Sequence, residues 1–240
     1  MFREIKKKQL ILENRKPYSN EICNYIYELN MADWIYSSLR LDNCALTRIQ
    51  IEKILGGNFI PDISLNDHAI VERYRNLYKT FTEMLAMSSS LNKEMLFTFA
   101  RKLTEDDKIS YRKTNPVLVS LNHNPPHPAE IDEQIDLVMH WFYSDDMNTN
   151  PILKAVRLHH RIIEVYPFDS CSEAVARAAM YYFLMEKGYH TFELTFSERE
   201  YNIAVIEYLK KENLMPFYKA VEISLFNKME VYMQLTANSP

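Results

Sequence analysis

Residues 166–177 hold most of the side chains in this sequence that could take part in chemistry. They read Tyr-Pro-Phe-Asp-Ser-Cys-Ser-Glu-Ala-Val-Ala-Arg and lie between two segments with helical patterning. The stretch leads into the second of these helices, and a helix N-terminus favours an anion. It contains no group that accepts a proton near neutral pH. Tyrosine has a reference pKa of about 10, so about one Tyr166 in a thousand would be ionised at pH 7.

The same stretch contains a capping pattern. Ser170 and Glu173 form Ser-x-x-Glu, which is typical of a capping box at a helix N-terminus. The Ser170 hydroxyl would accept from an amide of the first turn, and Glu173 would fold back onto a free amide. The helix dipole would then favour Glu173 rather than a phosphate. The pattern therefore predicts a helix that satisfies its own N-terminus.

Helical periodicity dominates the rest of the chain. The only glycines are Gly56, Gly57 and Gly188, which excludes a glycine-rich phosphate loop. Residues 116–121 are rich in β-branched side chains and precede Asn-His-Asn-Pro-Pro, which predicts one small β-hairpin. The expected fold class is therefore all-α with this hairpin. The expected helices cover residues 21–40, 47–55, 67–87, 93–103, 129–143, from 151 after a cap at Asn150, 174–187, 198–209 and 215–233, with Asp145 and Asp146 in a loop before Asn150.

Size and charge limit the possible partners. The chain has 240 residues, enough to bury a sizeable core, and we expect a single domain or at most two. A net charge of −4 gives no strong field for nucleic acid or an anionic membrane. No apolar run approaches the roughly 20 residues of a membrane span, and the N-terminus lacks a signal-peptide core. We expect a cytoplasmic protein with no nucleic-acid or membrane partner and with free thiols at Cys23, Cys44 and Cys171.

Residues 166–177 resemble, position for position, the signature HPFx(D/E)GNGRxxR of the Fic (Fido) family, which transfers AMP from ATP to protein hydroxyls. Pro167, Phe168 and Arg177 match. The flanks extend the resemblance over roughly residues 20–225, because residues 117–142 look like the family's flap hairpin, Pro-Pro loop and following helix. The resemblance implies one Fic-like domain over residues 1–240, divided into N-terminal helices at about 20–58, a core at about 60–225, and a helix end and tail at 226–240.

Several positions depart from the family's signature. Tyr166 stands in place of the histidine that acts as general base. Ser170 stands at the acidic position that holds Mg²⁺, although magnesium sites normally use one or two carboxylates. The neighbouring Asp169 is a weak candidate for that role, because a shift of one residue changes its direction on the turn. Cys171-Ser172-Glu173 replace the Gly-Asn-Gly turn that binds phosphate, and Ala174 replaces the first arginine. We expect neither ATP nor Mg²⁺ nor another metal to be needed, and no catalysis.

Residues 38–43, Ser-Leu-Arg-Leu-Asp-Asn, resemble the family's inhibitory pattern (S/T)xxxE(G/N), with Asp42 in place of glutamate and Asn43 at the last position. The resemblance implies that Asp42 pairs with Arg177. Ser38 and Asp42 are four residues apart and share a helical face, which we expect to point into the vestigial nucleotide pocket. Three interpretations of Arg177 stay open: a retained lock, a structural ion pair, or a surface arginine.

Two adjacent histidines are a further candidate. His159 and His160 face about 100° apart on a helix, which argues against joint metal binding and favours core or surface positions.

Three functions are compatible with these features. We favour a non-catalytic Fic protein that serves as a signalling, regulatory or binding scaffold. Its flap would add as a strand to a protein partner through Val117, Leu118, Val119, Ser120 and Leu121. The alternatives are a residual nucleotide-dependent transferase autoinhibited by its N-terminal helix, and a structural subunit of a homo-oligomer.

Overall fold

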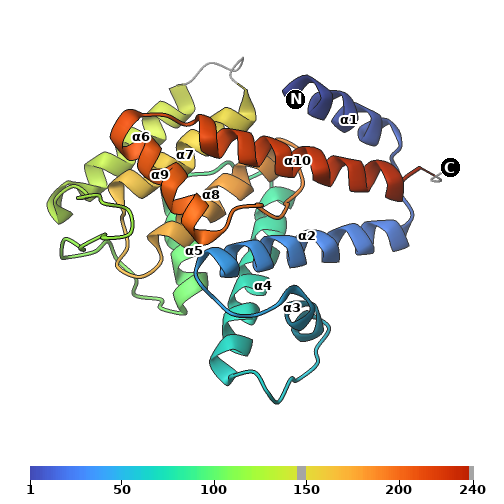
Figure 1. The fold of residues 1–240 in the computed structure, drawn as a ribbon, viewed down its shortest axis with the longest axis horizontal. Coiled ribbons are helices and arrows are strands. Elements are labelled where there is room, and N and C mark those ends of the chain that lie inside the picture. Colours follow the sequence, from blue (N-terminus) through green and yellow to red (C-terminus); the bar gives the residue numbers. More distant parts are fainter. Residues whose placement is uncertain (145–149, 238–240) are drawn as a thin grey trace.

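Helices form nearly all of the regular structure in the computed structural model, which describes residues 1–144 and 150–237 (Figure 1). The helices are α1 (Phe2–Asn14), α2 (Asn20–Leu41), α3 (Arg48–Leu55), α4 (Leu65–Ala86), α5 (Lys93–Thr104), α6 (Ile131–Ser144), α7 (Pro151–Val165), α8 (Ser172–Glu186), α9 (Glu198–Lys211) and α10 (Met215–Leu235), with a short 3₁₀ turn, η1 (Pro128–Glu130), before α6. No β-sheet forms within these two ranges. The all-α class predicted from the sequence is confirmed. The loop expected at Asp145 and Asp146 and the last three residues of the expected tail lie outside the described residues.

Side-chain caps explain most of the helix starts. A serine, threonine or asparagine accepts a hydrogen bond from a first-turn amide at the start of six helices, namely Ser19, Thr47, Ser64, Asn92, Asn150 and Ser197. Pro151 occupies the first helical position after the Asn150 cap, as predicted. These local signals place the ends of the helices within a few residues of the predicted ones.

Helix α8 lies at the centre of the molecule, against α7, α5 and α4. Every residue from Val175 to Leu184 is buried, and all except Arg177 are apolar or aromatic, so apolar side chains surround the helix rather than form one stripe. Helix α1 packs on α10, which brings the first and last helices side by side (Figure 1). The motif turn therefore leads directly into a buried helix.

Buried polar contacts fix α2 along its length. Asp33 accepts from Lys228 of α10 and from Arg48 of α3, and Lys228 is only 6% exposed. The Asn30 side chain accepts from the Tyr232 hydroxyl. Farther along α2, the Leu194 amide donates to the Ser37 hydroxyl at 2.9 Å. The helix is thus part of the core and not an appendage laid over it.

The predicted β-hairpin is wrong. Residues 117–121 form no strand, and a single bridge joins Leu118 and His123 around a tight turn. The amides of Leu121 and Asn122 each donate to the third residue before them at 3.2 Å. Prolines explain the short pairing: Pro116, Pro125 and Pro126 flank the bridge and have no N–H to continue a ladder. The flap is therefore an irregular loop with one bridged turn.

Candidate functional site

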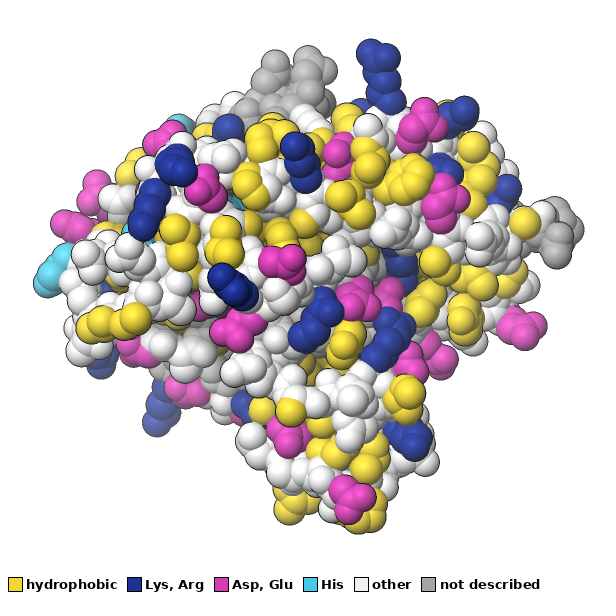
Figure 2. All heavy atoms as spheres, viewed as in Figure 1, with side chains coloured by type: hydrophobic (Ala, Val, Ile, Leu, Met, Phe, Trp, Pro, Cys, Tyr) yellow, Lys and Arg dark blue, Asp and Glu magenta, His cyan; other side chains and the backbone are white. Residues whose placement is uncertain are grey.

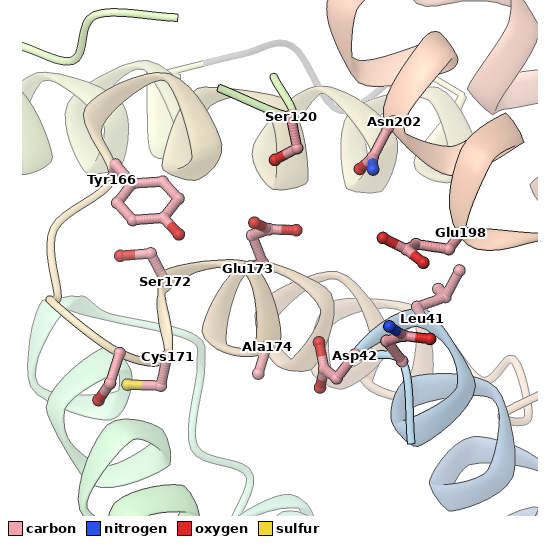
Figure 3. Close-up of a pocket in the computed structure, with 12 residues that line it drawn as sticks. Leu41, Asp42, Ser120, Tyr166, Cys171, Ser172, Glu173, Ala174, Glu198 and Asn202 are labelled. Atoms are coloured by element: carbon pink, nitrogen blue, oxygen red, sulfur yellow. The ribbon is translucent and has the colours of Figure 1, made fainter. Parts of the chain in front are cut away.

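A cavity of about 300 Å³ lies at the N-terminus of α8 (Figure 3). The turn that follows α7, the end of α2, the flap loop and the start of α9 all contribute walls. Of the predicted site residues, the cavity brings together Tyr166, Ser170–Ala174, Ser120, Asp42 and Asn43. The remaining motif residues lie elsewhere: Pro167 and Phe168 are buried, and Asp169 is exposed outside the lining.

Tyr166 ends helix α7 in a left-handed conformation, with φ of 49°, and its amide donates to the Ile162 carbonyl at 2.9 Å. This turn directs the phenol into the cavity (Figure 3). Burial and the nearby Glu173 carboxylate raise the pKa of Tyr166 to about 12. At pH 7 about one phenol in 10⁵ would be ionised, which makes Tyr166 a poorer proton acceptor than its reference value suggests.

The predicted capping box is wrong. Helix α8 begins at Ser172, and its N-cap, Cys171, makes no side-chain capping bond. Ser170 is exposed two residues before the first helical residue, too early to accept from the expected amide. The serine that makes local bonds is Ser172. Its hydroxyl accepts from the Phe168 amide and donates to the Phe168 carbonyl, both at 2.7 Å.

Glu173 is the second residue of α8, and its carboxylate lies in the cavity instead of folding back (Figure 3). Burial raises its pKa, Asp42 and Glu198 add to the shift, and Arg177 opposes it. Three carboxylates therefore line the cavity, on Asp42, Glu173 and Glu198. No lysine or arginine of the described chain lines it. The charged side chains that line the cavity are therefore all acidic, although a helix N-terminus forms its base.

Arg177 lies beneath this cavity and is fully buried. Its Nη2 donates to Asp42, and the Tyr74 hydroxyl donates to the second oxygen of the same carboxylate at 2.9 Å. The predicted proximity of Asp42 and Arg177 is thus present. The guanidinium also lies over the Tyr201 ring, with 5.7 Å between its Cζ and the ring centroid. Its Nε and Nη1 have no hydrogen-bond partner among the described residues.

Ser38 does not share this position. It is 2% exposed and does not line the cavity, although it is four residues before Asp42. Helix α2 ends at Leu41, and Asn43 has a φ of 59°, so the chain leaves the helical path at Asp42. The expected common face of Ser38 and Asp42 therefore ends at the helix C-terminus, and of these two residues only Asp42 lines the cavity.

The two adjacent histidines belong to the core. His159 and His160 are fully buried, and His159 Nε2 lies 2.8 Å from the Tyr201 hydroxyl. Burial lowers the pKa of both rings, that of His160 to about 4. Within residues 1–144 and 150–237, no group of three or more His, Cys, Asp or Glu is arranged to hold a metal ion.

Sequence reasoning did not identify two cavity residues on α9. Glu198 and Asn202 are one turn apart and complete the wall opposite Tyr166 (Figure 3). The available signal was general, because these residues lie within the span of about 20–225 that resembles the family. No local motif distinguishes Glu198 from the other acids at the start of α9.

Comparisons with known proteins match this region and this fold. The model of the Fic/DOC family matches residues 90–184. Protein adenylyltransferase Fic from Nematostella vectensis is 28% identical over 134 residues, which are 54% of this chain and 30% of that protein. The match thus spans less than a third of that relative's length.

Among the described helices, none has the length and apolar composition needed to cross a membrane.

Solved structures share the fold along the whole chain. A Fic-domain-containing signalling protein from Bacteroides thetaiotaomicron has a TM-score of 0.81 at 17% identity, covering 100% of this chain and 97% of its own. Fic-1 (residues 134–508) from C. elegans has a TM-score of 0.83 at 17% identity, covering 100% of this chain and 72% of its own. At such identities the likeness establishes the fold alone. Together with the match of the Fic/DOC family model to residues 90–184, it supports a Fic-domain protein related to AMP-transferases.

Proposed function

We propose that this chain is a non-catalytic Fic-domain protein that serves as a binding or regulatory scaffold. The charge of the cavity carries the proposal, because Asp42, Glu173 and Glu198 line it without a lysine or arginine of the described residues. The family resemblance implies that ATP phosphates would occupy this position. One unit charge on a phosphate about 5 Å from one carboxylate costs about 3 kcal/mol at an effective dielectric constant of about 20. Asp42 is paired with Arg177, and the two remaining carboxylates, on Glu173 and Glu198, would together oppose that ligand.

ATP with Mg²⁺ does not fit the residues present. The position that should supply a metal carboxylate is Ser170, and the nearby Asp169 does not line the cavity. Asp42 is engaged by Arg177 and by Tyr74. The turn before α8 carries a side chain at every position. The residues therefore offer neither a metal ligand set nor an open phosphate turn.

The residue at the position of the family's general base is not suited to proton transfer either. A general base should have a pKa near the working pH, and the pKa of Tyr166 is raised to about 12. The Cys171 thiol also lines the cavity, but burial raises its pKa to about 12. Neither group would activate a target hydroxyl near pH 7.

The scaffold role requires a surface for a partner, and the flap loop offers one. Val117 and Val119 are 87% and 80% exposed beside the rim residue Ser120. Exposed apolar side chains beside the cavity rim are suited to contact with a protein partner, whereas the turn that bridges Leu118 and His123 offers no strand for strand addition. Self-association is a less favoured form of this role. On the face shown in Figure 2, apolar side chains are interspersed with charged ones and form no continuous apolar area.

One observation favours the alternative of an autoinhibited residual transferase. Asp42, at the end of α2, engages the motif's remaining arginine, as the resemblance to the inhibitory pattern implies. In that alternative, loss of the Asp42 charge would release Arg177 for a nucleotide and reveal transfer.

Calorimetric titration with ATP and Mg²⁺, combined with an assay for AMP labelling of the protein, tests both proposals. We expect weak or no ATP binding and no label on the wild-type chain or on Asp42→Asn. Asp62→Asn is a matched control, because Asp62 is exposed and outside the cavity. A dissociation constant in the low micromolar range or tighter would refute the non-catalytic proposal. Label that appears in Asp42→Asn and is lost on adding Tyr166→Phe would establish the alternative.

A further inference from the structure

Arg112 is a second fully buried arginine, and it lies between the flap loop and the motif turn. It is 1% exposed and forms no ion pair with a carboxylate of the described chain. A buried guanidinium is unfavourable unless hydrogen bonds satisfy it. Its acceptors are all uncharged oxygens: Tyr166 O at 2.7 Å, Asn115 Oδ1 at 2.8 Å, Thr114 O at 3.0 Å, Pro126 O at 2.5 Å and Val165 O at 3.3 Å.

These acceptors belong to two parts of the chain. Thr114, Asn115 and Pro126 lie at the two ends of the flap loop. Val165 and Tyr166 lie at the C-terminus of α7, where the last helical carbonyls have no partner within the helix. The negative end of the helix dipole favours a cation at this place. The position of Arg112 therefore matches both the hydrogen-bond requirement and the charge of the helix end.

Two further hydrogen bonds join the region of Arg112 and the flap loop to the chain at the end of α7. The Arg112 amide donates to the Pro167 carbonyl at 2.9 Å. His123 Nε2, in the flap loop, donates to the Glu164 carbonyl at 2.8 Å. The consecutive carbonyls of residues 164–167 are thus all bonded by Arg112 or His123. Arg112 and His123 together therefore cap the C-terminus of α7.

The flap loop has little regular structure of its own. One bridge, between Leu118 and His123, closes its turn, and the flanking prolines prevent further pairing. The guanidinium fork holds both ends of this loop at once, which a single donor could not do. Ser120 of the loop and Tyr166 of the motif turn form walls of one cavity. Any change in the connection would therefore alter the cavity and the edge at Val117 and Val119.

We propose that Arg112 is a positioning residue, which fixes the flap loop and the Tyr166 turn relative to each other. It does not touch the cavity and acts through the carbonyls that it binds. The consequence for partner binding rests on the proposed scaffold function, whereas the positioning itself does not. The flap of this protein is then a preformed surface, held at both ends by one side chain.

Hydrogen–deuterium exchange measured by mass spectrometry tests the proposal on the full chain. Arg112→Met removes all side-chain donors at similar length, and Arg112→Lys keeps the charge but loses the fork. Lys113→Met is the matched control, because Lys113 is the exposed neighbour and makes no side-chain bond among the described residues. We expect exchange in residues 113–127 to be more than about tenfold faster in Arg112→Met, with Arg112→Lys intermediate and Lys113→Met unchanged. Peptides from α4 and α10 should exchange as in the wild type.

Two results would overturn the proposal. Unchanged exchange of residues 113–127 in both Arg112 variants would show that the loop does not depend on the fork. An equal increase in every peptide, α10 included, would make Arg112 a general contributor to stability only. If Arg112→Met does not fold, the comparison of Arg112→Lys with Lys113→Met decides. ATP titration of the same variants is separate, so tight ATP binding would refute the scaffold function and leave the exchange result standing.

Discussion

Replacing Asp42 with asparagine removes the carboxylate that ion-pairs with Arg177. The guanidinium is fully buried, and its Nε and Nη1 already lack hydrogen-bond partners in the described chain. The substitution keeps the shape and one acceptor but leaves a buried charge without a counter-ion. Breaking a buried ion pair costs about 3–5 kcal/mol. The Asp42 side chain is 36% exposed, so water screens part of the interaction and we expect about 2 kcal/mol.

The opposite substitution should cost less. Arg177→Met removes the buried charge and fills a similar volume, and the partly exposed Asp42 carboxylate can be hydrated. We therefore expect Asp42→Asn to be the more destabilising of the two. For a chain of this size, 2 kcal/mol corresponds to a fall in Tm of roughly 4–8 °C.

Urea denaturation of the two single variants and the double variant provides the measurement, with Asp62→Asn as the surface control. We expect the double variant to be less destabilised than the sum of the single variants by about 1–2 kcal/mol, because the pair is removed as a unit. Additive effects, or a larger loss for Arg177→Met than for Asp42→Asn, would refute this account of a buried cation that depends on one partly exposed carboxylate.

Three further predictions concern pH, catalysis and the backbone. Burial lowers the folded-state pKa of His159, His160 and His190, so below about pH 6.5 the unfolded chain binds more protons than the folded chain. The stability that these histidines contribute should therefore be fully present above that pH and fall towards pH 4, by up to about 1.4 kcal/mol per pH unit for each histidine. Urea denaturation midpoints at pH 7, 6 and 5 measure this fall. Tyr166→His alone should give no detectable AMP labelling, because the base returns without a phosphate turn or metal ligand, and measurable transfer would contradict this. Gly57→Ala should cost about 1 kcal/mol in urea denaturation, because Gly57 has a φ of +82° and no atom within 4 Å, so only the backbone is strained; a change as small as at an exposed helical site would contradict this.

Helix positions were predictable because local signals set them. Periodicity and the caps at Thr47, Asn150 and Ser197 act within a few residues, so a single sequence contains the information. Helix α1 was not predicted. Its two buried residues, Ile5 and Leu12, are surrounded by lysines and polar side chains, and its burial depends on α10. Tertiary contact decides such a helix, and the sequence near it does not.

Part of the site could be predicted, because the family resemblance indicated which residues far apart in the sequence lie in contact. The contact of Asp42 with Arg177 joins residues 135 positions apart, which no local rule could propose. Local chemistry at the same place was misleading. Ser170 and Glu173 satisfy the capping pattern, yet α8 starts at Ser172, because the Ser172 hydroxyl and the packing of Phe168 fix the preceding turn. Arg112 was missed for a related reason: four of its five side-chain acceptors are backbone carbonyls, which the residue types of a sequence do not reveal.

The buried ion pair of Asp33 in α2 with Lys228 in α10 has a consequence for the order of folding. Asp33 and its partner Lys228 are 195 residues apart, and Asn30 meets Tyr232 across a similar separation. Most contacts in a helical protein are local and form quickly. Here, the polar groups of α2 cannot be paired until α10 has been synthesised and docked. Intermediates that lack α10 would keep this face of α2 hydrated and its apolar neighbours exposed, which makes the docking of α10 the step at which aggregation competes with folding.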